Sequence, residues 1–290
     1  GDYDAANPNS TWEYMPNATF ATFNAFVNMR TRYKRVTPDN PANLGTRYRT
    51  ALDNGMNLSF SYQYAYDPNP VVEVSWENAA GEKLTVVDNH NTTYDRHVLQ
   101  LKDSNNKYYG AAANFTGLST TSATTTTTSS LATDPKAYLT FTETLERVQQ
   151  VGTAMDFTLE NGDTPIVLRG EFLYQKDVKT PVIDRAKLSY GHLTEALKME
   201  KADQFKYVLG ADVNVLTDMM VSGQFIQFRN LDYIDSPATC ATNTTGNSVN
   251  FNCGRYTADQ AAMHLTNGLQ KAEKNKEFYS LFLSKPFGES

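Results

Sequence analysis

The connections between alternating segments constrain the fold of this chain most strongly. Segments of about eleven residues alternate between apolar and polar side chains; turns of about three or four residues join them at one end and loops of roughly 28 to 80 residues at the other. Loops longer than about 12 to 15 residues are uncommon in compact soluble domains. Transmembrane β-barrels combine short turns on one side of the membrane with long loops on the other. The sequence therefore predicts an all-β chain that forms an antiparallel transmembrane β-barrel.

The alternation is clearest between Met56 and Tyr66, where every second residue is large and apolar and the residues between are polar or small. The same pattern recurs in four later segments, residues 151–159, 166–175, 205–216 and 221–225. Period-two alternation indicates strands with one apolar face, and a tilted strand needs about 9 to 11 residues to cross a bilayer. The aromatic residues Tyr62, Tyr64, Tyr66, Tyr174 and Phe205 are expected at one end of the strands, as an interfacial girdle.

A soluble antiparallel sandwich or barrel is the alternative fold, because its strands also alternate when one face packs on a core. Periodicity does not separate the two folds. The unequal connections favour the membrane barrel, and no run of about 18 apolar residues predicts a membrane-spanning helix.

The ends of the sequence suggest part of a longer barrel. About seven spanning segments are expected, whereas bacterial single-chain barrels have an even number of strands. The chain begins at Gly1 and stops at Ser290 soon after an extended segment. Residues 1–290 are accordingly expected to form a single, partial β-barrel domain.

Two long loops are expected to carry structure of their own outside the membrane. Residues 67–136 form the first, with a hairpin around Asn78–Gly81, and residues 230–276 form the second. In the second loop, Cys240 and Cys253 are expected to form a disulfide, worth about 3 kcal/mol by constraint of the unfolded chain. Thr257 and Gln260 have the spacing of a capping box and predict a short helix that ends near Gly268. Another short helix is expected at 192–202.

The composition and motifs argue against several functions. A net charge of -6 argues against nucleic acid as a partner. Neither a Gly-x-Ser-x-Gly nor a His-Glu-x-x-His motif occurs, so we expect no enzyme activity, no cofactor and no metal site. The four histidines, His90, His97, His192 and His264, are all expected in loops. Asp88 and Asp95 lie near two of them, but the group has no known metal-ligand spacing and indicates a solvated hairpin tip.

Charged residues also occur on the polar faces of neighbouring predicted strands. In a barrel they face the lumen, where they either line a channel or pair across strands. The candidates are Arg169, Glu171, Lys206, Asp212 and Asn214. Arg169 and Asp212 are a plausible pair because consecutive strands carry them.

Several strings resemble a family of large proteobacterial outer-membrane β-barrels that is known as a domain of unknown function. The strings are Tyr207–Asp212, Leu168–Phe172 with Tyr174, Ser222–Phe225, Phe278–Phe287 and Pro70–Trp76 with Ala80–Gly81. The resemblance implies a porin-like channel that is linked to envelope exporters of the resistance-nodulation-division superfamily and handles hydrophobic compounds. Members are longer than this chain, at both ends.

Together these observations predict a channel or transporter for small, hydrophobic compounds in the lipid bilayer of the bacterial outer membrane, with periplasmic components of an export system as further partners. Two alternatives stay open. The barrel could be the anchor of a surface-exposed structural or partner-binding protein, or it could belong to an outer-membrane hydrolase.

Overall fold

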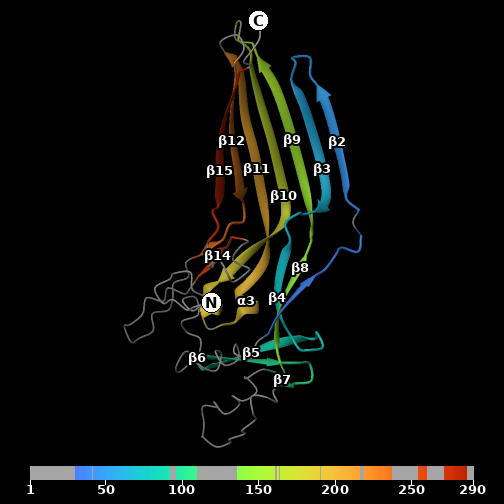
Figure 1. Ribbon diagram of the computed structural model, residues 1–290, viewed down its shortest axis with the longest axis vertical. Coiled ribbons are helices and arrows are strands. Elements are labelled where there is room, and N and C mark those ends of the chain that lie inside the picture. The colour runs from blue at the N-terminus through green and yellow to red at the C-terminus, as the bar shows by residue number, and fades with distance from the viewer. Residues whose placement is uncertain are drawn as a thin grey trace, which may run out of the picture.

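The computed structural model describes residues 30–40, 42–91, 96–109, 136–160, 162, 164–189, 191–215, 219–236, 254–259 and 271–285. This part of the chain is mostly β, with the short helices α2 (Arg185–Ser189) and α3 (Leu193–Ala196). No helix among the described residues is both long enough and apolar enough to cross a membrane. The strands form two sheets, and the long strands of one rise from a compact region formed mainly by the other (Figure 1).

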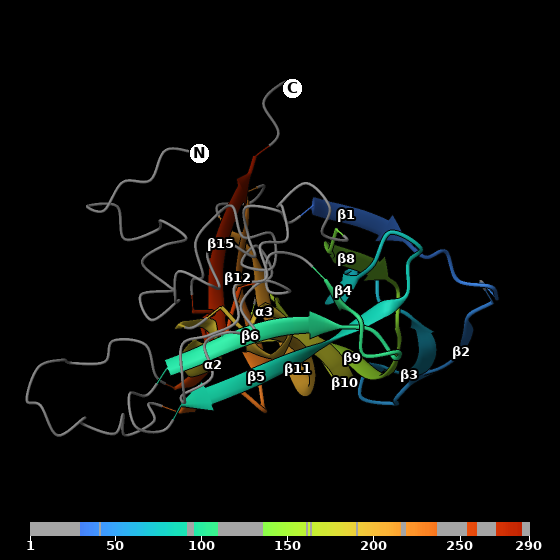
Figure 2. The ribbon, with the colours of Figure 1, turned by 90° about the horizontal axis from the view of Figure 1, so that it is seen from below.

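The larger sheet has a main path of antiparallel strands in the order β15-β12-β11-β10-β9-β3-β2. Their bounds are β2 (Leu44–Ala51), β3 (Asn57–Tyr66), β9 (Arg147–Leu159), β10 (Ile166–Asp184), β11 (Leu197–Val215), β12 (Met219–Asn230) and β15 (Asn275–Ser284). We call its part within residues 44–51, 57–64, 149–159, 166–175, 204–215, 219–229 and 275–284 the upper sheet. Seen from below, its strands follow a curve (Figure 2).

The predicted asymmetry of the connections is confirmed, but the lengths differ from the prediction, since the upper connections have three to six residues and the shortest lower one has twelve. At the upper end, residues 52–56, 160–165 and 216–218 join neighbouring strands. At the lower end the connections are longer and comprise residues 67–146, 185–196 and 231–274. The long connections therefore all leave from one end of the sheet.

The five strands predicted from alternation are all present, although four of them extend beyond the predicted bounds. β10 and β11 are longer than the alternation indicated, because each continues below the upper sheet. At that point the pairing of β10 with β11 shifts between Gln175 and Val178. Asp177 lies in this β-bulge with a φ of 59°, and its backbone N–H donates to Asp203 Oδ1 at 3.0 Å. Aspartate tolerates the left-handed conformation better than most residues, so it suits the bulge.

The smaller sheet has the order β1-β8-β4-β5-β6-β7. Its strands are β1 (Arg30–Arg35), β4 (Val71–Glu77), β5 (Lys83–Asn91), β6 (Arg96–Lys102), β7 (Tyr108–Tyr109) and β8 (Tyr138–Thr144). Among the described strands, only β1 and β8 pair in parallel. The connection 67–136 thus contains more than the predicted hairpin, since β4 to β7 all belong to this sheet.

We call the lower region the base: the smaller sheet, the two helices, the lower parts of β10 and β11, and the short strands β13 (Asp235–Ser236) and β14 (Arg255–Thr257). Its apolar core joins both sheets and the helices. The core residues include Trp76, Leu84, Leu101, Leu139, Ile183, Leu188, Leu193, Leu197 and Tyr256. The base therefore has the packed interior of an ordinary soluble domain.

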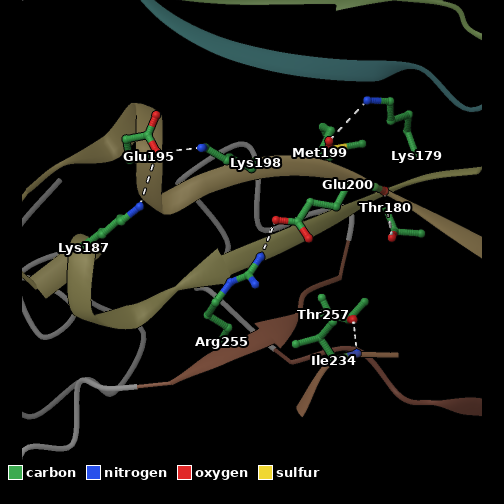
Figure 3. A network of polar contacts seen from close by, with 10 residues as sticks. All are labelled: Lys179, Thr180, Lys187, Glu195, Lys198, Met199, Glu200, Ile234, Arg255 and Thr257. Atoms are coloured by element: carbon green, nitrogen blue, oxygen red, sulfur yellow. Dashed lines mark hydrogen bonds and ion pairs between the residues drawn. The ribbon is translucent and has the colours of Figure 1, made fainter. Parts of the chain in front are cut away.

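Polar contacts tie the elements of the base together around this core (Figure 3). Glu195 of α3 accepts from Lys198 at 2.6 Å and from Lys187 at 3.3 Å, and Arg255 of β14 pairs with Glu200 of β11. Thr257 Oγ1 accepts a hydrogen bond from the Ile234 backbone N–H at 2.9 Å. Thr257 ends β14, and Ala258 after it forms a β-bridge with Lys271, so no helix begins directly after Thr257 and the expected helix cap is wrong.

Two further expectations need correction. The helix expected over residues 192–202 is limited to α3, because Leu197 onward pairs with β10 as β11. The histidines are not all in loops, since His90 lies in β5 and His97 in β6, where the register pairs them. Cys240, Cys253, His264 and most of the helix predicted after Thr257 lie outside the described residues.

The core of the base generates a prediction about stability. Leu139 is 0% exposed and Leu281 of the upper sheet is 72% exposed. We expect Leu139→Ala to lower the free energy of unfolding by about 2 to 5 kcal/mol, because it leaves a cavity. The control Leu281→Ala removes the same atoms from an uncovered surface, so its effect in detergent should be much smaller. Urea unfolding of both variants measures the difference, and equal losses would contradict the packed base.

Glu77 links β4 to the edge strand β1. Its side chain is 5% exposed, and its carboxylate lies 2.6 Å from Lys34 Nζ and 3.2 Å from Arg32 Nη1. Burial by itself raises the pKa of Glu77, but the hydrogen bond from Lys34 and the charges of Lys34 and Arg32 outweigh it. The pKa of this carboxyl therefore lies below its ordinary value.

This shift predicts a pH dependence of stability. An unfolded glutamate has a pKa of about 4.3, and the folded value lies below it. The stabilisation by ionised Glu77 is therefore present above about pH 4.3 and is lost as the pH falls through the lower, folded value. Glu77→Gln should remove this component, so that its urea midpoint falls less steeply than that of the parent between about pH 5 and pH 3. Parallel curves would show that Glu77 does not contribute.

Candidate functional site

The register of the upper sheet separates its side chains into two faces. In β10 and β11, Leu173 is paired with Lys206, Glu171 with Val208 and Arg169 with Gly210. Paired residues of neighbouring strands lie on the same face. The predicted residues Arg169, Glu171, Lys206, Asp212 and Asn214 consequently share one face, which we call the polar face.

The opposite, apolar face is uncovered. No element among the described residues lies over it, and many of its large side chains are exposed: Leu44, Tyr48, Phe60, Tyr62, Tyr64, Val151, Met155, Leu159, Leu168, Leu209, Tyr279, Leu281 and Leu283. Within the described upper sheet, no large apolar side chain is buried. Exposed apolar surfaces of more than a few hundred Å² are rare on soluble monomers and mark contacts with other molecules or with membranes.

Aromatic rings lie together on the apolar face, toward its lower end. Rings in β10, β11, β12 and β15 form a chain of contacts, with centroids 6.3 Å apart for Phe172 and Tyr207, 5.8 Å for Tyr207 and Phe225, and 5.1 Å for Phe225 and Tyr279. Pairing through Val151 places the predicted girdle residues Tyr62, Tyr174 and Phe205 in one row across the sheet.

Side chains on the polar face pair with one another across strands. The expected ion pair is present, with Arg169 Nη2 2.7 Å from Asp212 Oδ1, and Arg169 also donates to Ser222 Oγ at 3.4 Å. On the same face, nearer the β2 edge of the sheet, Asn57 donates to Asp156 at 2.7 Å. Both members of the ion pair keep contact with solvent, so their charges are available to a solute at this face.

Several residues of the polar face were not identified from the sequence. Arg47 and Arg49 belong to β2, which was not predicted because alternation in residues 44–51 involves threonine and glycine beside a few large side chains. Arg47 donates to Ser59 Oγ at 3.2 Å. Phe228 and Lys276 also lie on this face, since pairing connects both to Lys206. Only the register shows this, because Phe228 interrupts the polar pattern.

Shallow hollows follow the polar face. One of about 580 Å³ is lined by Arg47, Arg49, Asp156, Arg169 and Glu171. Another, of about 550 Å³, extends past Glu171 to Lys206 and Phe228. Their position indicates that the sheet curves toward its polar face.

Comparison of the chain with protein-family models, with curated proteins and with solved structures gives no match.

Proposed function

We propose that the upper sheet is part of the wall of a β-barrel in the bacterial outer membrane, and that this barrel gives small compounds passage through the membrane. The uncovered apolar face carries the proposal. In water, such a face would be covered by a second layer, as the base shows within the same chain. In a bilayer, lipid chains cover it instead.

The dimensions of the apolar face support this proposal. On β11 it extends from Phe205 to Val215, which corresponds to about 33 Å along a strand. At a tilt of about 40° this length gives a height of about 25 Å, the usual height of the apolar band of an outer-membrane barrel. The aromatic rings at its lower end, next to the base, suit the boundary between lipid and water.

The two edge strands require a partner in this environment. β2 and β15 end the main path of the sheet, so each has one row of backbone groups without a neighbouring strand on that path. Inside a bilayer these groups must be paired, and only closure of the sheet achieves this. We therefore infer that further strands, in this chain or in another copy of it, join β2 to β15 in the membrane.

The polar face then lines the lumen. Its ion pair and hollows leave charged groups in contact with solvent, as in the channels of porin-like barrels. The sequence resemblance to large outer-membrane barrels adds hydrophobic compounds as cargo and periplasmic exporter components as partners. The base, by this arrangement, forms a folded domain outside the lipid.

A pair of charge substitutions tests the orientation of the wall. Leu209 and Val208 are neighbours in the middle of β11 and point to opposite faces. We expect Leu209→Arg to weaken folding into phospholipid vesicles by about 2 to 4 kcal/mol, because it places a charge in lipid. The matched variant Val208→Arg puts the same charge on the polar face and should cost much less. Equal effects, or a parent protein that is monodisperse in buffer without detergent, would contradict the proposal.

Conductance in planar bilayers tests the lumen. Arg169→Ala and Asp212→Ala remove opposite charges from the ion pair, so we expect them to shift the selectivity between anions and cations in opposite directions. Leu281→Ala, on the apolar face, is the control and should conduct as the parent does. If neither charge variant alters conductance or selectivity, the polar face does not line the path.

A further inference from the structure

One row of the polar face combines apolar and positively charged residues. The register places Leu173 of β10, Lys206 of β11, Phe228 of β12 and Lys276 of β15 side by side across the sheet. Phe278, also on this face, comes next to the row. A cation thus lies on either side of Phe228 in this row.

The aromatic surface in this row is accessible. The rings of Phe228 and Phe278 have centroids 5.7 Å apart, and the two residues are 40% and 49% exposed. Lys206 Nζ lies 5.6 Å from the centre of the Phe228 ring. Rings at this separation offer a flat apolar group a surface to pack against, while the nearby ammonium group marks one end of that surface.

The positive charge in this row is only weakly compensated. Within the described part of the chain, no ion pair joins Lys206 to a carboxylate, although the charge of Asp67 lies near enough to attract it. Lys276 lies 3.8 Å from Asp259. Both lysines line one hollow of about 240 Å³, together with Phe228. The other charged residues along that hollow are Lys179, Arg229, Asp259, Glu273 and Lys274. Cations outnumber carboxylates there, so the hollow favours an anion.

We propose that this row binds small amphipathic organic anions, with a carboxylate at Lys206 and Lys276 and an aromatic or aliphatic body against Phe228 and Phe278. The proposal rests on the proposed passage of small compounds and names their chemical class. A half-buried ammonium group gains a charge-assisted contact from the carboxylate, and the apolar body covers exposed ring surface. An uncharged hydrophobic compound would satisfy only the second requirement.

Binding to the purified, detergent-solubilised protein tests the site. The probes are biphenyl-4-carboxylate and its uncharged analogue biphenyl-4-carboxamide, and titration calorimetry at neutral pH measures both. We expect the carboxylate to bind at least about tenfold more tightly than the carboxamide, because one charge-assisted contact is worth this factor or more. Acetate, which lacks the apolar body, should give no measurable binding.

Variants locate the site. Lys206→Met keeps a long unbranched side chain but removes its charge, and it should reduce the preference for the carboxylate while leaving carboxamide binding unchanged. Lys206→Arg should restore the preference. Phe228→Ala should weaken the binding of both probes. Lys198→Met removes a positive charge from the same strand, in the base, and is the matched control that should bind as the parent does.

Each outcome decides the matter. Equal binding of the two probes to the parent, or an unchanged preference in Lys206→Met, would overturn the inference. The result also separates the site from the proposed passage. Lysine-dependent binding by a protein that conducts no ions would support the binding site and contradict the channel. Conductance without probe binding would support the channel and contradict the binding site.

Discussion

The structure depends on how its apolar strand faces are covered. β10 and β11 each have a lower part within the base and an upper part in the upper sheet. In the base, Ile183 and Leu197 are almost completely buried in a core shared with β4, β8 and the helices. Above the bulge at Asp177, no second layer covers the same two strands among the described residues. One pair of strands thus passes from a region where a protein core covers its apolar side chains into one where such side chains, Leu168 and Leu209 among them, are exposed.

This change of environment organises the upper sheet. Period-two alternation places most of its large apolar side chains on one face and most of its charged side chains on the other. The Arg169–Asp212 ion pair and the Asn57–Asp156 hydrogen bond then lie on a common surface. Such contacts across strands hold neighbours in register. The same surface carries Lys206 beside Phe228. One face therefore holds the contacts between strands and also exposes charged and aromatic groups to a solute.

Sequence reasoning succeeded where alternation was strong and failed where it was diluted. Met56 to Tyr66 has a large apolar residue at every second position, and β3 was found almost to the residue. β2 was not predicted, because threonine and glycine weaken the alternation of apolar and polar residues in residues 44–51. His90 and His97 were assigned to loops, although each pairs with the other in a hairpin, because their strands contain many polar residues. Thr257 has the local sequence of a helix cap, but its hydroxyl group accepts from Ile234 of a distant segment.

The sequence by itself determined which side chains of a strand share a face, since this follows from the geometry of a single extended chain. It therefore indicated that Arg169, Glu171, Lys206 and Asp212 lie on polar faces, and that the long connections leave from one end. Only the tertiary structure decided which residues are neighbours across strands. Lys206 lies between Leu173 and Phe228 because of the register of three strands, which depends on pairing between distant segments. Tertiary contacts likewise determine the fold of the base, because its core consists of one or a few residues from each of many short elements.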